Sequence, residues 1–194
     1  MDIEHAGDTI QRRIMAMNKR VQDLRAANLY FYNQPIEELR GGARVLVNGR
    51  EMGMYASYSY LGLVGHPRIN QAAKDAIDRY GCGSGASRLI SGNMALHEEL
   101  EAKLAAFKGT ESALIFNSGF QANCGLISTL VGDGDVIFSD VLNHASIIDG
   151  CRLSRAKTVV YGHCDVDQLE RDLKQAPHAR RKLIVTETIF SMDG

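Results

Sequence analysis

The chain has 194 residues, of which 45% are hydrophobic and 23% are charged, and its formal net charge at pH 7 is −1. This composition is typical of a soluble globular protein with one large domain, or with one domain and an N-terminal appendage. It gives no electrostatic reason to expect nucleic acid or an anionic membrane as a partner. No apolar stretch approaches the roughly 20 residues of a membrane span, and the polar N-terminus has no signal-peptide core, so we expect a cytoplasmic protein.

The four cysteines have no regular spacing and form no CxxC pair; they lie at positions 82, 124, 151 and 164. Zinc sites and the disulfide frameworks of small secreted proteins are built on repeated, closely spaced cysteines. We therefore expect reduced, partly buried thiols and no metal site.

The first 60 residues predict an N-terminal arm and a small β-ribbon. Residues 8–29 place apolar side chains at three- and four-residue steps, which is typical of an amphipathic helix, here with a basic outer face. In the segment ARVLVNGREMGMYA, two short alternating runs flank Asn48 and Gly49, a strong hairpin signal. We expect residues 1–60 to form this arm and ribbon, and residues 61–194 to belong to the main domain.

From Pro67 onward, helices and strands alternate. We expect helices over 68–80 and over HEELEAKLAAF, the second ending at Lys108 and Gly109, with a glycine-rich loop over 81–93 between them. The predicted strands are ALIF (113–116), VIFS (136–139), TVVY (158–161) and KLIVTE (182–187), and the helices between them cover 119–131, 145–154 and 165–175. Short, continuously apolar strands separated by helices predict an α/β fold with a parallel sheet covered on both faces.

The glycine-rich segment GCGSGASR (81–88) superficially resembles the GxGxxG motif of dinucleotide-binding proteins. That motif needs a strand before it and a helix that begins inside it, whereas here a helix precedes and the next begins about ten residues later. No GKS or GKT sequence occurs, so a Walker A phosphate loop is excluded as well. The segment is either a loop packed against a neighbouring element or a loop that contacts a substrate.

The tetrapeptide NSGF (117–120) lies between the predicted ALIF strand and a helix. The backbone N–H groups of Gly119 and Phe120 would point out of the helix N-terminus, where unpaired donors and the helix dipole favour a phosphate, and Ser118 adds a hydroxyl. Asparagine and serine are also the commonest residues at helix starts. An anion site and an ordinary helix cap are both consistent with this sequence.

His144 in LNHASIIDG occupies the equivalent place one βα unit later, at the carboxyl end of the VIFS strand. The segment TETIFSMDG reaches the same edge after the next strand and offers Glu187, Ser191 and Asp193. Ligand crevices of open α/β sheets lie outside the carboxyl ends of the strands. His144 is therefore either a structural histidine at a helix start or a residue of such a crevice.

Five motifs, in their order and spacing, resemble the α-oxoamine synthase family of fold-type I pyridoxal phosphate (PLP) enzymes. They begin at about Tyr60 and run to the last residue: YLGLVGHP, GSGASRLISG followed by HEELE, FNSGFQAN, DVLNHASIIDG and TETIFSMDG. The resemblance implies a PLP-dependent transferase large domain with a mostly parallel sheet between helices. It also implies an N-terminal helical arm and β-ribbon, and a sheet that is incomplete in this chain.

The resemblance further implies a PLP-dependent acyltransferase. Such an enzyme condenses an amino acid with an acyl thioester of CoA or acyl carrier protein, usually with decarboxylation, to give an α-oxoamine. PLP acts as the electron sink for the carbanion formed at Cα. Ser118, Gly119 and Phe120 would bind the cofactor, the latter two through phosphate contacts, and His144 would stack on its ring as a catalytic residue.

The remaining site residues implied by the resemblance lie in two loops. Ser191 would donate a hydrogen bond to the phenolic oxygen of the cofactor, with Glu187 close by. Ser84, Ser87 and Arg88 would contact the substrate across a subunit interface, so a homodimer is expected.

Two departures from the family pattern concern the acyl donor. The family usually carries an asparagine before YLGL in contact with the acyl-CoA, where this chain has Tyr58 and Ser59. Some members hold the acyl carboxylate with an N-terminal arginine, whereas the comparable segment here, NLYFYNQPIEE, is aromatic and has none. Both departures argue against a small dicarboxylic acyl group, so we expect a more apolar or carrier-borne donor.

The Schiff-base lysine of the family, and the aspartate that pairs with the pyridine nitrogen, would lie beyond Gly194. None of the seven lysines of this chain stands in the matching context. We therefore expect the N-terminal part of such an enzyme, inactive alone. Two alternatives stay open: another fold-type I PLP enzyme, such as an aminotransferase, or a non-catalytic truncated fragment.

Overall fold

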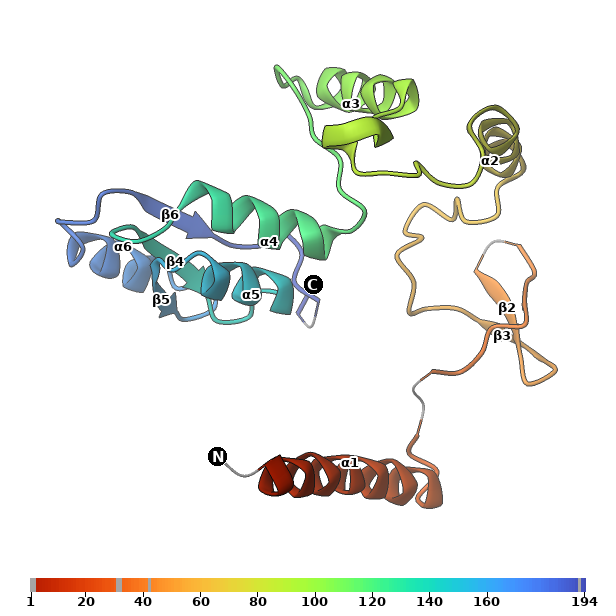
Figure 1. Ribbon diagram of the computed structural model, residues 1–194, viewed down its shortest axis with the longest axis horizontal. Coiled ribbons are helices and arrows are strands. Elements are labelled where there is room, and N and C mark those ends of the chain that lie inside the picture. Colours follow the sequence, from red (N-terminus) through yellow and green to blue (C-terminus); the bar gives the residue numbers. More distant parts are fainter. Residues whose placement is uncertain (1–2, 31–32, 42, 192) are drawn as a thin grey trace. The chain divides into compact units, whose positions relative to one another are not determined.

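The computed structural model describes residues 3–30, 33–41, 43–191 and 193–194. It divides into two compact units, Met1–Ser84 and Gly85–Gly194, of which the second holds the parallel sheet (Figure 1). The domain boundary that we predicted between residues 60 and 61 stays a prediction. None of the helices in the described ranges is both long and apolar enough to cross a membrane.

The first unit contains the predicted amphipathic helix and hairpin. Its elements are α1 (Ile3–Ala26), β1 (Glu38–Leu39), β2 (Arg44–Val47), β3 (Arg50–Gly53) and α2 (Pro67–Tyr80). The three strands are antiparallel in the order β1-β2-β3. Asn48 and Gly49 have φ values of 51° and 68°, the left-handed conformation that a two-residue hairpin turn requires at both positions. The hairpin prediction is therefore confirmed.

A π-helical turn, η1 (Arg88–Gly92), follows at the start of the second unit, where the sequence predicted only a loop. A Cβ atom at Gly92 would lie 1.9 Å from the carbonyl oxygen of Ala86, so the turn closes onto the preceding loop at a distance that only glycine permits. The predicted helix after it is α3 (Ala95–Lys108), and its C-cap Gly109 has the expected left-handed φ of 66°.

The turn is fixed to α3 by an ion pair between Arg88 and Glu101. Arg88 Nη1 and Nη2 lie 2.5 Å and 2.9 Å from the two carboxylate oxygens of Glu101, and Arg88 Nε donates to Asn93 Oδ1 at 2.9 Å. The backbone N–H of Ile115 also donates to Glu101 Oε1 at 2.9 Å. The guanidinium and this N–H lower the pKa of Glu101 from 4.5 to about 2.

The sheet of the second unit is built from three parallel strands with helices between them. Its elements are α4 (Gly119–Leu130), β4 (Val136–Asp140), α5 (Ala145–Leu153), β5 (Lys157–Tyr161), α6 (Val166–Lys174) and β6 (Lys182–Val185). The strand order is β5-β4-β6, and Ile137 of the central strand pairs with Thr158 and Leu183. The prediction of an α/β fold with a parallel sheet is confirmed.

The predicted strand ALIF (113–116) is wrong. This segment lies outside every strand, and within the described ranges the three strands of the sheet pair only with one another. A strand exists through ladder hydrogen bonds to a neighbour, so an apolar run without a partner keeps no strand. The KLIVTE strand is also shorter than predicted, because β6 ends at Val185.

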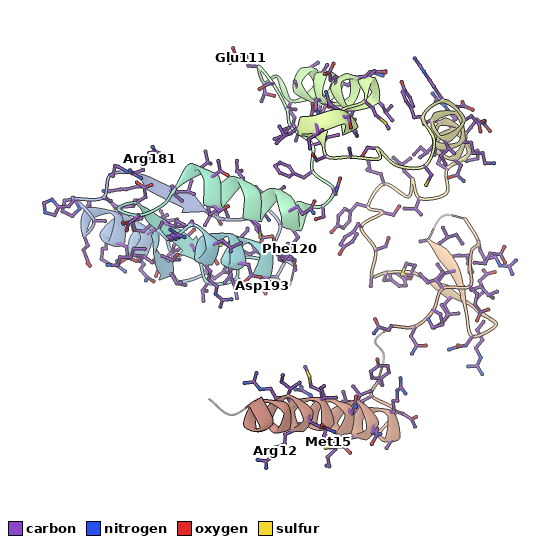
Figure 2. All side chains as sticks on the ribbon, in the orientation of Figure 1. Arg12, Met15, Glu111, Phe120, Arg181 and Asp193 are labelled. Atoms are coloured by element: carbon purple, nitrogen blue, oxygen red, sulfur yellow. The ribbon has the colours of Figure 1, made fainter. Side chains whose placement is uncertain are left out.

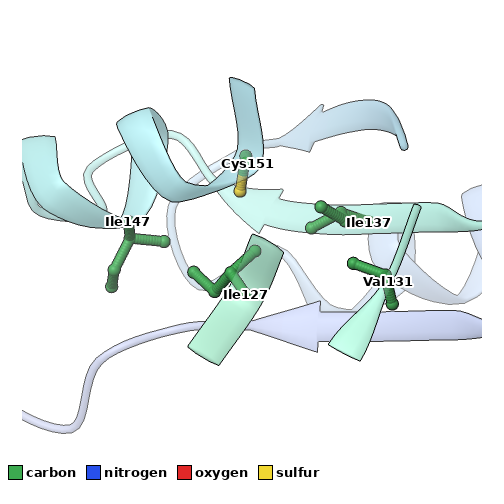
Figure 3. Packing of buried hydrophobic residues seen from close by; sticks show 5 residues of the cluster. All are labelled: Ile127, Val131, Ile137, Ile147 and Cys151. Carbon is green, nitrogen blue, oxygen red and sulfur yellow. The ribbon is translucent and has the colours of Figure 1, made fainter. Parts of the chain in front are cut away.

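The core lies on both faces of β4, all five residues of which are buried. On one face, α4 and α5 pack on the sheet through Ile127, Val131, Ile137, Ile147 and Cys151 (Figure 3). The other face buries Val136, Phe138 and Tyr161 against residues that include Leu169 and Leu173 of α6. Side chains that point alternately to the two faces of β4 are therefore buried on both, as expected for a sheet covered by helices on both faces.

Helices α4 and α5 approach each other closely at Gly150. A Cβ atom at this position would lie 2.9 Å from the carbonyl oxygen of Asn123 and 3.1 Å from Cδ1 of Ile127. Glycine therefore allows the two helices to meet, and their contact brings Asn123 beside Ser146.

We expect the Arg88–Glu101 pair to contribute stability that depends on pH. Because the pKa of Glu101 is lowered from 4.5 to about 2, the contribution is full above about pH 4.5 and is lost as the pH falls toward about 2. Glu101→Gln should lower the free energy of unfolding at neutral pH and flatten its dependence on pH across that window. Urea denaturation at several pH values measures both effects.

The matched control is Glu170→Gln. Glu170 lies 2.6 Å from Lys174, and both side chains are exposed on α6. Exposed ion pairs of this kind stabilise little, so the control should leave the pH dependence nearly unchanged. Equal effects of the two substitutions would contradict the role assigned to Glu101.

Candidate active site

Side chains join the carboxyl ends of β4 and β6. Asn143 Nδ2 donates to the carbonyl oxygen of Val185 at 2.8 Å and lies 3.0 Å from the hydroxyl of Ser139. The backbone N–H of His144 donates to the Glu187 carboxylate. His144 and Glu187, which the sequence placed at one edge of the sheet, are therefore in direct contact.

Asn143 is a residue of this edge that the sequence analysis missed. It is 4% exposed, and its side-chain oxygen is buried without a hydrogen-bond partner among the described residues. Exchanging the oxygen and nitrogen would turn two acceptors toward each other at Val185, so this orientation is required. Buried acceptors are seldom left unpaired, so this oxygen is an exception among the polar atoms of the edge.

His144 is the N-cap of α5, and its ring is held on one edge. Its Nδ1 atom lies 3.1 Å from the backbone N–H nitrogen of Ser146 and 2.7 Å from the Ser146 hydroxyl oxygen. Asn123 Nδ2 on α4 donates to the same hydroxyl at 2.9 Å. Ser146 is 1% exposed, whereas His144 is exposed. The structural reading of His144 as a cap is thus correct, and it leaves the ring accessible at the edge of the sheet.

The N-terminus of α4 combines a side-chain cap with backbone donors that have no acceptor within the helix. The Ser118 hydroxyl accepts from the backbone N–H of Gln121 at 3.2 Å, which makes Ser118 a true N-cap. The N–H groups of Gly119 and Phe120 are the first two of the helix and have no acceptor within it. A Cβ atom at Gly119 would meet no atom within 4 Å, so this first helical position can carry a side chain.

Ser191 lies in a turn closed by two backbone hydrogen bonds between Phe190 and Gly194. Phe190 is 7% exposed and its ring packs edge-on against His163, with 4.5 Å between ring centroids. Ser191 is exposed, and within the described ranges it forms no hydrogen bond with His144. Figure 2 shows Phe120 and Asp193 at the same end of the second unit.

Beside this turn, Asp140, His163 and Cys164 place potential metal-ligating atoms within 4.8 Å of one another. The Asp140 carboxylate accepts from the backbone N–H groups of Leu142 and Cys164 at 2.9 Å and 3.0 Å, and lies 3.1 Å from His163 Nδ1. Burial opposes ionisation, but these hydrogen bonds outweigh it and lower the pKa of Asp140. The carboxylate thus links the end of β4 to the segment that follows β5.

The three residues predicted to contact the substrate are placed differently. Arg88 is half-buried and is engaged with Glu101 and Asn93, as described above. Ser87 is exposed at the start of η1, and Ser84 is the last residue of the first unit. The contact between Gly92 and the backbone of Ala86 lies within the predicted loop 81–93, so both roles that the sequence left for this loop stay open.

Comparison with known proteins identifies the family. Residues 54–194 match the family described as aminotransferase class I and II. The chain is 55% identical over 176 residues to an 8-amino-7-oxononanoate synthase of Geobacter sulfurreducens, an alignment that covers 90% of this chain and 44% of that protein. The chain spans about half the length of the curated relatives that it matches.

Solved structures give the same assignment. The serine palmitoyltransferase of Sphingomonas wittichii superposes with a TM-score of 0.87 at 34% identity, covering 99% of this chain and 47% of that chain. A high-resolution structure of SPT with PLP gives a TM-score of 0.89 at 31% identity, covering 93% and 46%. The fold-type I assignment and the resemblance to the α-oxoamine synthases are confirmed. The chain therefore belongs to the aminotransferase class I and II family of PLP enzymes, among the α-oxoamine synthases.

Proposed function

We propose that the protein forms 8-amino-7-oxononanoate by PLP-dependent condensation of an amino acid with an acyl thioester. The observation that carries this proposal is the 55% identity over 176 residues to a relative named for that product. The matched family region, 54–194, contains every crevice residue described above. Identity to the serine palmitoyltransferase of S. wittichii is 34%, which makes that activity the weaker candidate.

The product named for the relatives, 8-amino-7-oxononanoate, determines both substrates. Its oxo carbon is the former thioester carbonyl, so the acyl donor is a seven-carbon dicarboxylic (pimeloyl) thioester. The remaining two carbons and the amino group derive from alanine after its carboxylate leaves as CO₂. This proposal replaces the apolar acyl donor expected from the sequence. That expectation relied in part on residues 31–32, which lie outside the described residues.

The α4 N-terminus and the ring of His144 fit PLP. When bound, PLP supplies the electron sink that stabilises the carbanion at Cα of the amino acid. We assign the N–H groups of Gly119 and Phe120 to its phosphate, because they are the first two of α4 and have no acceptor within the helix. Ser118 holds this helix start in place, and His144 lies against the cofactor ring with its exposed face.

The other predicted site residues enter the proposal with supporting roles. Glu187 fixes the backbone of His144 through their hydrogen bond. Ser191, exposed in the turn after β6, is assigned to the phenolic oxygen of the cofactor. Ser84, Ser87 and Arg88 are assigned to the substrate side; for Arg88 this requires that Glu101 and the substrate share the guanidinium.

We also propose that the protein is a cytoplasmic homodimer. Leu89, Ile90 and Phe107 are 99%, 84% and 81% exposed, and a second subunit would bury such apolar side chains. All four cysteines are free thiols, which is typical of proteins in a reducing compartment.

Turnover of a thioester panel tests the proposed reaction. The full-length protein with PLP is supplied with pimeloyl, succinyl and palmitoyl thioesters, each with alanine, serine or glycine, and thiol release is measured. We expect pimeloyl thioester with alanine to give the highest kcat/KM, by on the order of 10²-fold over palmitoyl thioester, because a site that binds the terminal carboxylate rejects a donor that lacks it. Preference for palmitoyl thioester and serine would contradict the proposal, as would amino-group exchange with keto acids without thiol release.

Two substitutions at Gly119 test the phosphate contact. Gly119→Pro removes the N–H at the first helical position, where proline is tolerated, and the preceding Ser118 already has the extended ψ of 156° that proline requires. Gly119→Ala is the matched control, since it adds a Cβ atom and keeps the N–H. We expect the PLP dissociation constant to be about 10- to 100-fold higher for the proline variant than for the alanine variant. Equal affinities of two folded variants, measured by PLP titration, would remove this contact from the proposal.

A further inference from the structure

The buried hydroxyl of Ser146 lies between two other polar side chains. It is 2.7 Å from Nδ1 of His144 and accepts from Nδ2 of Asn123 at 2.9 Å. Ser146 is 1% exposed, so its hydroxyl is shielded from water. Asn123 belongs to α4 and Ser146 to α5, so this small network also depends on the close helix contact at Gly150.

The direction of these hydrogen bonds follows from the backbone N–H of Ser146, because this group can only donate. The backbone N–H of Ser146 points at Nδ1 of His144, 3.1 Å away, and a ring nitrogen accepts only where it carries a lone pair and no proton. The Asn123 amide donates to the Ser146 oxygen, which leaves the hydroxyl proton for Nδ1. A proton on Nδ1 would face the backbone N–H directly and would repel it.

We propose that Ser146 and Asn123 are positioning residues that hold His144 as the Nε2–H tautomer. The lone pair of the ring then faces the protein, and the opposite ring edge carries an N–H donor. Where PLP binds as in the proposed function, His144 offers a hydrogen-bond donor and no basic nitrogen to the reacting groups. The Cα proton must therefore be taken by a different residue.

Nitrogen-15 spectroscopy of the histidine rings reports the tautomer directly. The full-length, PLP-free protein is labelled at its histidines, and two-bond proton–nitrogen correlations are recorded about two pH units above the ordinary histidine pKa of about 6.5. His144 is assigned by the loss of its signals in His144→Gln, and exposed His178 serves as an internal reference. We expect a pyrrole-type Nε2 and a pyridine-type Nδ1 for His144. The reverse pattern, or the same tautomer ratio as His178, would overturn the proposal.

Substitutions at the positioning residues make the test specific. Ser146→Ala keeps the backbone N–H but removes the hydroxyl, so the ratio of Nε2–H to Nδ1–H should fall about 2- to 10-fold, the worth of one hydrogen bond. Asn123→Asp should lower it as well, because a carboxylate takes the hydroxyl proton and leaves the Ser146 oxygen to accept from Nδ1–H. Ser146→Thr retains the hydroxyl and should restore the wild-type ratio.

Far-UV circular dichroism confirms that each variant is folded. If Ser146→Ala fails to fold, Asn123→Asp carries the test, since it removes no buried atom. Unchanged ratios in the folded variants contradict the proposal. Because the spectra are recorded without cofactor or substrate, this outcome is independent of the thioester panel, and either proposal can fail while the other stands.

Discussion

The connection between the carboxyl ends of β4 and β6 is the constraint on which the rest of the crevice depends. β4 is buried on both faces, so packing fixes the position at which the segment between β4 and α5 begins. Asn143 then binds the last carbonyl group of β6, and Glu187 accepts from the backbone N–H of His144. These contacts fix the start of α5, and with it the ring of His144, before any cofactor is present.

The residues that meet at this edge could be predicted from the sequence because the topology of a parallel sheet determines them. Parallel strands place their carboxyl ends at one edge of the sheet, so His144 and Glu187 could be placed together although 43 residues separate them. Local rules were equally sufficient for the hairpin turn at Asn48 and Gly49, where the required left-handed backbone selects the residues.

Features that depend on how particular segments pack together were missed. The segment 113–116 has the composition of a strand, but strand formation requires a neighbour that composition does not specify. The π-helical turn before α3 depends on the close packing of Gly92 on the backbone of Ala86. The hydrophobic pattern of the sequence does not predict this contact. The anchoring of His144 by Asn123 likewise depends on how two helices meet. Such contacts are set by packing in three dimensions, and only the structure reveals them.

A crystal structure of the full-length protein with PLP would show directly whether this crevice binds the cofactor. We predict that the phosphate lies about 2.7–3.2 Å from the N–H nitrogens of Gly119 and Phe120. We also predict that the imidazole of His144 lies against the pyridine ring, with Nδ1 still bound to Ser146. A phosphate bound elsewhere, or a His144 ring turned away from the cofactor, would contradict these predictions.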